Sequence, residues 1–204
     1  FIFGYEKDGR TFVGASPEIL VRHRGNEILS YALAGTAPKD RPHAWTKEQL
    51  LTDEKNLFEH NIVRDRIVHT MNEVTQDISV GKTEIMELAH LYHLRTIITA
   101  KDSTKSLVEW AELLHPTPAL GGEPRDKALA LLQQYEAHER GMYAAPFGFM
   151  KDMGDGIIVV AIRSALIMDN VLYAYAGCGV VADSDADEEY IETNNKMRTI
   201  LDAL

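Results

Sequence analysis

The sequence "GIIVVAIRSALI" (residues 156–167) contains the longest clear apolar run in the chain, "IIVVAI" at 157–162. A short apolar run of this kind, bounded by turn residues, predicts a buried β-strand. The flanking segments "GMYAAPFGFM" (141–150) and "VLYAYAGCGVV" (171–181) also have strand character, and the linkers "KDMGDG" and "MDN" have turn chemistry. The sequence therefore predicts three consecutive strands, with Arg163 inside the central one.

Two β-hairpins are predicted at the start of the chain. "FIFGYE" and "TFVGAS" flank the turn "KDGR", and "ILVRHR" and "EILSYALAG" flank the turn residues Gly25 and Asn26. Farther along, "LYHLRTIITA" (91–100) is expected to form another strand. The chain thus supplies several antiparallel strands.

Helical periodicity begins near Thr46. Apolar residues then recur at helical spacing, which predicts one long amphipathic helix over 46–76. Residues 106–115 predict a short helix stopped by the prolines of "HPTPALGGEP", and 125–139 predict another that ends at Gly141.

The last predicted helix covers 185–204, with Ser184 and Asp187 at the spacing of a capping box. Together with the strands, these helices define an α+β protein. We expect residues 1–204 to form one unit, with antiparallel strands and long helices on the outside.

Composition restricts the partners of this chain. The formal net charge of −10 argues against a nucleic-acid partner, although local charge at a site can still favour an anionic small substrate. The longest apolar run falls far short of the ~20 residues that span a bilayer, and no signal peptide is apparent. A single cysteine, Cys178, fits a reducing compartment. We therefore expect a cytoplasmic protein with no membrane partner.

Carboxylates gather on two of the predicted helices. Glu189, Glu192 and Lys196 can share one face, which either a solvated helix surface or the wall of a site would explain. The long helix carries polar residues along one side: Asp53, Asn56, Glu59 and His60. Carboxylates from two helices that met at one point would form an oxygen-rich site suited to Mg²⁺. The sequence alone does not show this convergence.

Three other positions have both a structural and a functional interpretation. A buried Arg163 needs an anionic partner, either a structural carboxylate or the carboxylate of a ligand. Gly177 and Gly179 at a strand end can form a tight turn or let a ligand approach the backbone. Glu18 in "ASPE" lies between strands, where it is either a fixed acid or an exposed turn residue.

Eight motifs in order resemble the chorismate-utilising enzymes, and isochorismate synthases of menaquinone and siderophore biosynthesis most of all. They are "GASPEIL", "LAGT", "KNLFEH", "HPTPALGG", "RGMYAAPFG", "AIRSA", "YAGCGVV" and "EEYIETNNK", and they cover essentially the whole chain. The resemblance implies a fold of antiparallel sheets packed face to face with helices outside, as in anthranilate synthase component I. It also implies that residues 1–204 are the C-terminal portion of a chorismate-binding domain.

The resemblance implies a Mg²⁺-dependent isomerase that converts chorismate to isochorismate. Glu59 and Glu192 match the carboxylates that hold Mg²⁺, Glu189 matches a further acidic residue near the metal, and Asn56 stands where some relatives carry another Glu. Water is added at C2 and hydroxide leaves from C4, and Glu18 matches the general acid for the departing hydroxyl. This role requires surroundings that keep the Glu18 carboxyl protonated near neutral pH.

Other matched residues are expected to contact the substrate chorismate. Arg163 and Tyr143 match the pair that binds the enolpyruvyl carboxylate, helped by the backbone at Gly177, and His93 matches an active-site histidine. Lys196 matches a lysine near the substrate carboxylates, and Gly35 and Thr36 match a loop under the ring. Ala119 occupies a position that varies among relatives. A dianionic substrate needs such fixed positive charge in a closed site.

Three local features separate the possible relatives. Ala34 stands where aminodeoxychorismate synthases carry a covalent lysine, and "HPTPALGG" is typical of water-using rather than ammonia-using relatives such as anthranilate synthase. Salicylate synthases tend to carry Thr where Ala119 aligns. These features favour isochorismate synthase over its alternatives.

The general base of the family is a lysine well upstream of the "SPE" glutamate, and only 17 residues precede Glu18 here. Lys7 lies in the predicted hairpin turn and is not assigned this role. An alternative function is therefore a non-catalytic module that binds Mg²⁺ and chorismate. The sequence does not indicate the oligomeric state.

Overall fold

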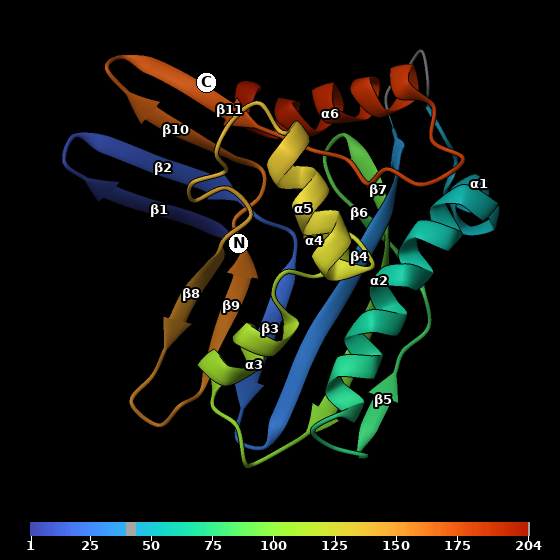
Figure 1. Ribbon diagram of the computed structural model, residues 1–204, viewed down its shortest axis with the longest axis vertical. Helices are drawn as coiled ribbons and strands as arrows, with labels where there is room; N and C mark the ends of the chain where they lie inside the picture. The colour runs from blue at the N-terminus through green and yellow to red at the C-terminus, as the bar shows by residue number, and fades with distance from the viewer. Residues whose placement is uncertain (40–43, 204) are drawn as a thin grey trace.

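The computed structural model describes residues 1–39 and 44–203, which form strands β1 to β11 and helices α1 to α6 (Figure 1). The strands are β1 (Ile2–Lys7), β2 (Arg10–Ala15), β3 (Ile19–Arg24), β4 (Glu27–Pro38), β5 (Ile78–Val80), β6 (Glu84–Glu87), β7 (Leu91–Lys101), β8 (Pro146–Met150), β9 (Gly156–Val160), β10 (Ser164–Met168) and β11 (Val171–Tyr175). The helices are α1 (Lys47–Thr52), α2 (Glu54–Asn72), α3 (Leu107–Leu114), α4 (Pro118–Gly121), α5 (Arg125–Tyr135) and α6 (Ala186–Leu201).

The strands form two sheets in which all neighbours are antiparallel. A four-stranded sheet has the order β1-β2-β10-β11, and a seven-stranded sheet has the order β5-β7-β4-β3-β9-β8, with β6 also paired to β7. The predicted α+β class with antiparallel sheets and helices is confirmed, as are both N-terminal hairpins and the strand at 91–100.

The stretch 156–167 is not one strand, which corrects the prediction. It forms β9 and β10, which belong to different sheets, and Arg163 between them has a left-handed backbone with φ of 52°. The chain makes the same change of sheet at residues 16–18, between β2 and β3. Hydrogen bonds join these two crossings: Ala15 N–H donates to Arg163 O at 3.0 Å, and Val160 N–H donates to Glu18 O at 3.1 Å. The crossings bring Glu18 and Arg163 to one region.

The main hydrophobic core lies between the seven-stranded sheet and the helices α2 and α3. Ile67 and Met71 of α2 and Trp110 of α3 are buried there against strand residues such as Leu20 and Ile98. In Figure 1, α2 runs alongside β4 and α3 lies beside β3 and β9. This packing fixes α2, and therefore Glu59, relative to β4.

The predicted helix at 46–76 is two helices, α1 and α2, interrupted at Asp53. Asp53 has an extended backbone, and its side chain accepts a hydrogen bond from Asn56 N–H, so it caps the start of α2. The predicted helix at 125–139 ends earlier, at Tyr135, where α5 stops. Periodicity did not reveal either boundary because a capping residue can sit inside an apolar repeat without disturbing it.

The ends of other elements also differ from the sequence predictions. The N-cap of α6 is Asp185, whose side chain accepts from the N–H groups of Asp187 and Glu188, while Ser184 donates instead to Glu189. The final predicted residue, Leu204, lies outside the described residues. Of the strands predicted at 141–150 and 171–181, only β8 and β11 are formed.

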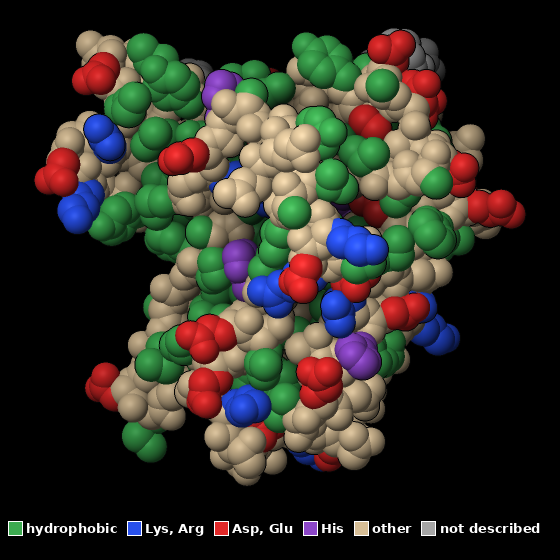
Figure 2. All heavy atoms as spheres, viewed as in Figure 1, with side chains coloured by type: hydrophobic (Ala, Val, Ile, Leu, Met, Phe, Trp, Pro, Cys, Tyr) green, Lys and Arg blue, Asp and Glu red, His purple; other side chains and the backbone are tan. Residues whose placement is uncertain are grey.

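The two sheets meet through a smaller aromatic cluster. Phe3 and Phe12 of the four-stranded sheet pack together, and the ring of Phe3 lies 4.7 Å from that of Phe147 in β8, measured between centroids. Figure 2 shows hydrophobic side chains gathered over the four-stranded sheet at the upper left. Among the described residues, no helix has the length and apolar character needed to cross a membrane.

Candidate functional site

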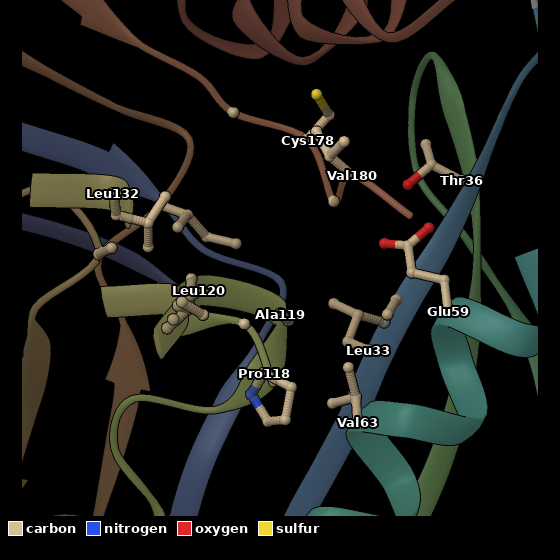
Figure 3. A pocket seen from close by; sticks show the side chains of 18 of the residues that line it. Leu33, Thr36, Glu59, Val63, Pro118, Ala119, Leu120, Leu132, Cys178 and Val180 are labelled. Atoms are coloured by element: carbon tan, nitrogen blue, oxygen red, sulfur yellow. The ribbon is translucent and has the colours of Figure 1, made fainter. Parts of the chain in front are cut away.

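A cavity of about 670 Å³ opens between α2, the α4–α5 segment and the loop that joins β11 to α6 (Figure 3). It is lined by many of the residues selected from the sequence: Glu18, Thr36, Glu59, His93, Ala119, Tyr143, Arg163, Gly177 and Lys196. These residues come from widely separated parts of the chain. The cavity is therefore the candidate active site.

Three residues predicted for the site do not line the cavity: Gly35, Glu189 and Glu192. Each of them lies against a residue of α2 or α6. Gly35 sits at an irregularity of β4 with φ of +78°, and a Cβ there would lie 2.9 Å from Asn56 O of α2. Glu192 pairs with Lys196, and Glu189 pairs with Lys55. Asn56 supports β4, because its Oδ1 accepts from Thr36 N–H at 2.8 Å.

Glu18 is buried where the chain crosses between the sheets. Burial raises its pKa to about 8, although the positive charges of Arg163 and Lys196 act to lower it. Its Oε1 has no hydrogen-bond partner among the described residues. The carboxyl is therefore largely protonated at neutral pH, as the predicted acid role requires.

Arg163 reaches from its left-handed backbone position into the buried end of the cavity. Its Nη2 donates to His93 Nε2 at 2.8 Å, and no described residue accepts from its buried Nη1. Burial lowers the Arg163 pKa to about 10, so the guanidinium stays charged at neutral pH. The sequence left the partner of Arg163 open, and the structure shows a neutral imidazole on one arm and a free donor on the other.

His93 is held in one tautomer by its two neighbours. A guanidinium only donates, so His93 Nε2 must accept, and the proton lies on Nδ1, 3.0 Å from Thr36 Oγ1. Burial, with Arg163 and Lys196 nearby, places the His93 pKa well below its ordinary value. His93 is thus a neutral residue that orients Arg163.

Glu59 and Lys196 also line the cavity, and Glu192 lies beside them. Burial and then the negative charge of Glu192 raise the pKa of Glu59 to about 7. Lys196 Nζ lies 2.5 Å from Glu192 Oε1 and donates to Gly177 O at 2.9 Å. Gly179 passes so close that a Cβ there would lie 2.4 Å from Glu59 Oε1. In Figure 3 the Glu59 carboxylate points from α2 into the cavity.

The Glu59–Glu192 pair fits a hard divalent cation. Carboxylate oxygens are the ligands that Mg²⁺ prefers, and Mg²⁺ usually keeps several waters and needs few protein ligands. No group of three or more His, Cys, Asp or Glu side chains in the described part of the chain is arranged to hold a metal. Glu189 Oε1 is already occupied, because it accepts from Lys55 Nζ and from Ser184 Oγ.

The apolar wall of the cavity was not predicted from the sequence. Leu33, Val63, Pro118, Leu120, Leu132 and Val180 line it, as Figure 3 shows. Tyr143 forms part of the same wall and stacks on Tyr175 with centroids 5.4 Å apart. Apolar residues of this kind resemble ordinary core residues in sequence, and only the tertiary structure brings those of β4, α2, α4, α5 and the loop after β11 around one cavity.

His60, the residue after Glu59, is structural. It is fully buried, its Nδ1 pairs with Ala34 O at 3.1 Å, and its Nε2 pairs with Thr96 Oγ1 at 2.8 Å. These two bonds tie α2 to β4 and β7. The "EH" dipeptide therefore combines a cavity carboxylate with the residue that fixes its helix.

Comparison with known proteins identifies the family of this chain. The profile of the chorismate-binding enzyme family matches residues 1–204, so the chain belongs to that family. The chain is 37% identical over 211 residues to the isochorismate synthase MenF of Bacillus subtilis, covering 100% of this chain and 44% of that protein. It is 34% identical to anthranilate synthase component 1 of Arthrobacter globiformis, covering 100% of this chain and 40% of that protein.

A solved structure has the same fold over nearly the whole chain. The Bacillus anthracis protein assigned as a 2,3-dihydroxybenzoate-specific isochorismate synthase, DhbC, superposes with a TM-score of 0.92 at 32% identity, covering 99% of this chain and 56% of that one. The chain thus spans about half the length of the relatives it matches.

Proposed function

We propose that this chain carries the metal and substrate site of a Mg²⁺-dependent isochorismate synthase, which isomerises chorismate to isochorismate. One arrangement carries the proposal. A buried, protonated Glu18 and the Nη1 of Arg163, unpaired among the described residues, lie in a cavity that is also lined by Glu59 and by Lys196, the ion-pair partner of Glu192. This arrangement provides an acid, an anion-binding donor and a cation-binding pair around one small substrate.

The proposed role of each site residue follows from its chemistry. Arg163, oriented by His93, donates from Nη1 to a carboxylate of chorismate, since a charge-assisted bond there satisfies a buried donor. Glu18 donates its proton to the hydroxyl that leaves from C4, and burial keeps that proton available at neutral pH. Lys196 adds positive charge beside the cavity.

Glu59 and Glu192 are the proposed ligands of Mg²⁺. When bound, the metal supplies fixed positive charge for the second carboxylate of the substrate. Glu189, which pairs with Lys55 and Ser184, has the weaker claim to a place among the ligands. The two proposed ligands come from α2 and α6, which the Lys55–Glu189 ion pair connects in the tertiary structure.

A second candidate function is a module that binds chorismate and Mg²⁺ without turnover. It is favoured by the state of Lys196, the only lysine among the described residues that line the cavity, because its Nζ is engaged by Glu192 and Gly177. Lys7 is exposed at the end of β1. No described lysine is therefore positioned as the base that activates water.

Anthranilate and aminodeoxychorismate synthesis are less consistent with the site. Ala34 occupies the place of the covalent lysine, and residues 118–122 of "HPTPALGG", a motif that resembles the water-using form, line the cavity. We propose a cytoplasmic enzyme of menaquinone or siderophore biosynthesis; a structural relative from Escherichia coli is described as menaquinone-specific, and a Vibrio cholerae relative as vibriobactin-specific.

The test is to incubate the 204-residue chain with chorismate and Mg²⁺ and to separate the products by chromatography. Isochorismate that disappears with EDTA and with Glu192→Ala, but persists with the exposed Glu188→Ala, supports the synthase. Mg²⁺-dependent chorismate binding without turnover, measured by calorimetry, supports the binding module. A folded chain, verified by circular dichroism, that neither binds nor converts chorismate contradicts both functions.

A further inference from the structure

Helix α6 carries Glu192 and Lys196 of the proposed site, yet few side chains of this helix are buried. Over its 16 residues, the buried side chains are those of Glu189 and Ile200. Ile200 lies near the C-terminal end, where His90 Nε2 also contacts Asp202 Oδ2 at 3.0 Å. In the N-terminal half of α6, which includes Glu192, the buried side chain is that of Glu189.

That carboxylate is anchored to α2 and to the loop before α6. Lys55 of α2 forms an ion pair with Glu189 Oε1, and the two side chains are only 22% and 9% exposed. Ser184 Oγ donates to the same oxygen at 2.7 Å and also accepts from Val181 N–H at 3.1 Å. A paired and largely buried charge of this kind is costly to disrupt from one side.

The spacing of these residues relates the ion pair to the proposed metal ligands. Lys55 and Glu59 are four residues apart on α2, and Glu189 and Glu192 are three residues apart on α6. Residues three or four apart lie on one face of a helix, about one turn from each other. The Lys55–Glu189 pair therefore joins the two helices one turn from the place where Glu59 and Glu192 approach.

We propose that Lys55 is a positioning residue, which through its ion pair with Glu189 sets the separation between Glu59 and Glu192. This inference rests on the proposed function, because it assigns Lys55 a purpose in the same site. Lys55 itself does not line the cavity. It acts by fixing the helix that carries Glu192.

A positioning role and a purely electrostatic role of Lys55 predict different effects when its partner Glu189 is substituted. If Lys55 served only as a positive charge near the carboxylates, Lys55→Met and Glu189→Gln would act in opposite directions, because they remove opposite charges. If the pair positions α6, both substitutions release the same contact. The two single variants then behave alike, and the double variant adds little.

The first measurement is hydrogen exchange of the α6 amides at 187–196, which needs neither metal nor substrate. Lys55→Met and Glu189→Gln are expected to exchange there about tenfold faster than wild type, since local opening becomes easier. Two matched controls should leave α6 unchanged: Lys47→Met, whose ion pair joins α1 to Glu87, and Glu188→Gln, the exposed neighbour of Glu189.

The second measurement is the Mg²⁺ dependence of turnover. The Mg²⁺ concentration for half-maximal rate should rise about tenfold in Lys55→Met and in Glu189→Gln, with a smaller fall in kcat at saturating Mg²⁺. Lys55→Arg, which keeps the ion pair, should restore most of the affinity. A loss of folded protein alone would lower kcat and leave the half-saturating concentration unchanged.

The outcomes separate this inference from the proposed function. Normal exchange of α6 in both variants overturns the positioning role even if the wild-type chain is an active synthase. Opposite effects of the two variants on the Mg²⁺ requirement also overturn it. If the wild-type chain makes no isochorismate, the proposed function fails, while faster α6 exchange and non-additivity in the double variant still support the anchor.

Discussion

Arg163 Nη2 donates to His93 Nε2 across 2.8 Å, although the two residues are 70 positions apart in the chain. A charged guanidinium and a neutral imidazole form this buried pair, and the second arm of Arg163 has no partner among the described residues. An unpaired donor in a buried site is costly unless a ligand satisfies it. We therefore propose that a carboxylate of the substrate binds to this free arm of Arg163.

Arg163→Lys should weaken chorismate binding even though it keeps the positive charge. A lysine cannot hold His93 and offer a second fixed donor to a carboxylate, because it lacks the planar fork of arginine. We expect KM for chorismate to rise at least about tenfold, with a smaller change in kcat. Steady-state kinetics measure this, and Arg22→Lys, which alters a surface ion pair with Glu27, is the control. An unchanged KM would exclude Arg163 as the carboxylate ligand.

Glu18→Gln should abolish turnover while retaining binding. The amide has the shape of the protonated acid but no proton to give to the departing hydroxyl, so a loss of about 10²-fold or more in kcat is expected. Chorismate affinity, measured by calorimetry, should stay within a few fold. If Glu18→Gln keeps near-normal kcat, another group is the acid.

The same substitution should change how stability depends on pH. The Glu18 pKa is raised from 4.5 to about 8 in the folded chain, so the folded state holds this proton more tightly than the unfolded state does. The stabilising contribution is fully present below about pH 4.5 and is lost as pH rises through 8. Glu18→Gln removes this dependence.

Urea unfolding at pH 5 and pH 9 tests that expectation. Relative to wild type, Glu18→Gln should gain stability between these two pH values, by an amount on the order of a few kcal/mol. The exposed Glu27→Gln provides a control in which the difference stays nearly constant. A parallel pH dependence in wild type and Glu18→Gln would show that Glu18 is ionised at neutral pH.

Gly179→Ala should disturb the proposed metal pair without unfolding the chain. A Cβ at this position would lie 2.4 Å from Glu59 Oε1, and a carboxylate at the end of a flexible side chain is displaced more easily than backbone. We expect the half-saturating Mg²⁺ concentration to rise about tenfold, as for other disturbances of metal-ligand orientation. Gly4→Ala is the control, since its Cβ would meet only Val13 Cγ1 at 3.8 Å. Equal Mg²⁺ requirements in both variants would argue against Glu59 as a ligand.

Several elements of the fold could be predicted because their signals are local. The hairpins around Gly25 and Asn26 and the strand at 91–100 follow from turn chemistry and apolar patterns, which depend on neighbouring residues alone. The break at Arg163 could not be predicted in this way. An apolar run is equally compatible with one strand or with two strands in different sheets, and pairing partners decide between them.

The candidate site shows the same division. The resemblance of eight motifs selected residues that the structure brings to one cavity, including Glu18, His93, Arg163 and Lys196. It did not indicate the anchoring by Lys55 of Glu189, because Lys55 lies in an ordinary amphipathic pattern with nothing to mark its partner.

The α+β class, the local elements and the types of residue available for catalysis follow from the amino-acid sequence, since periodicity, turn residues and motifs act over short distances. The protonation of Glu18, the neutral state of His93 and the approach of Glu59 to Glu192 depend on the folded chain. Desolvation and charge interactions arise from residues far apart in the sequence, and they come into effect only when the chain crosses between the sheets and the Lys55–Glu189 ion pair connects α2 with α6.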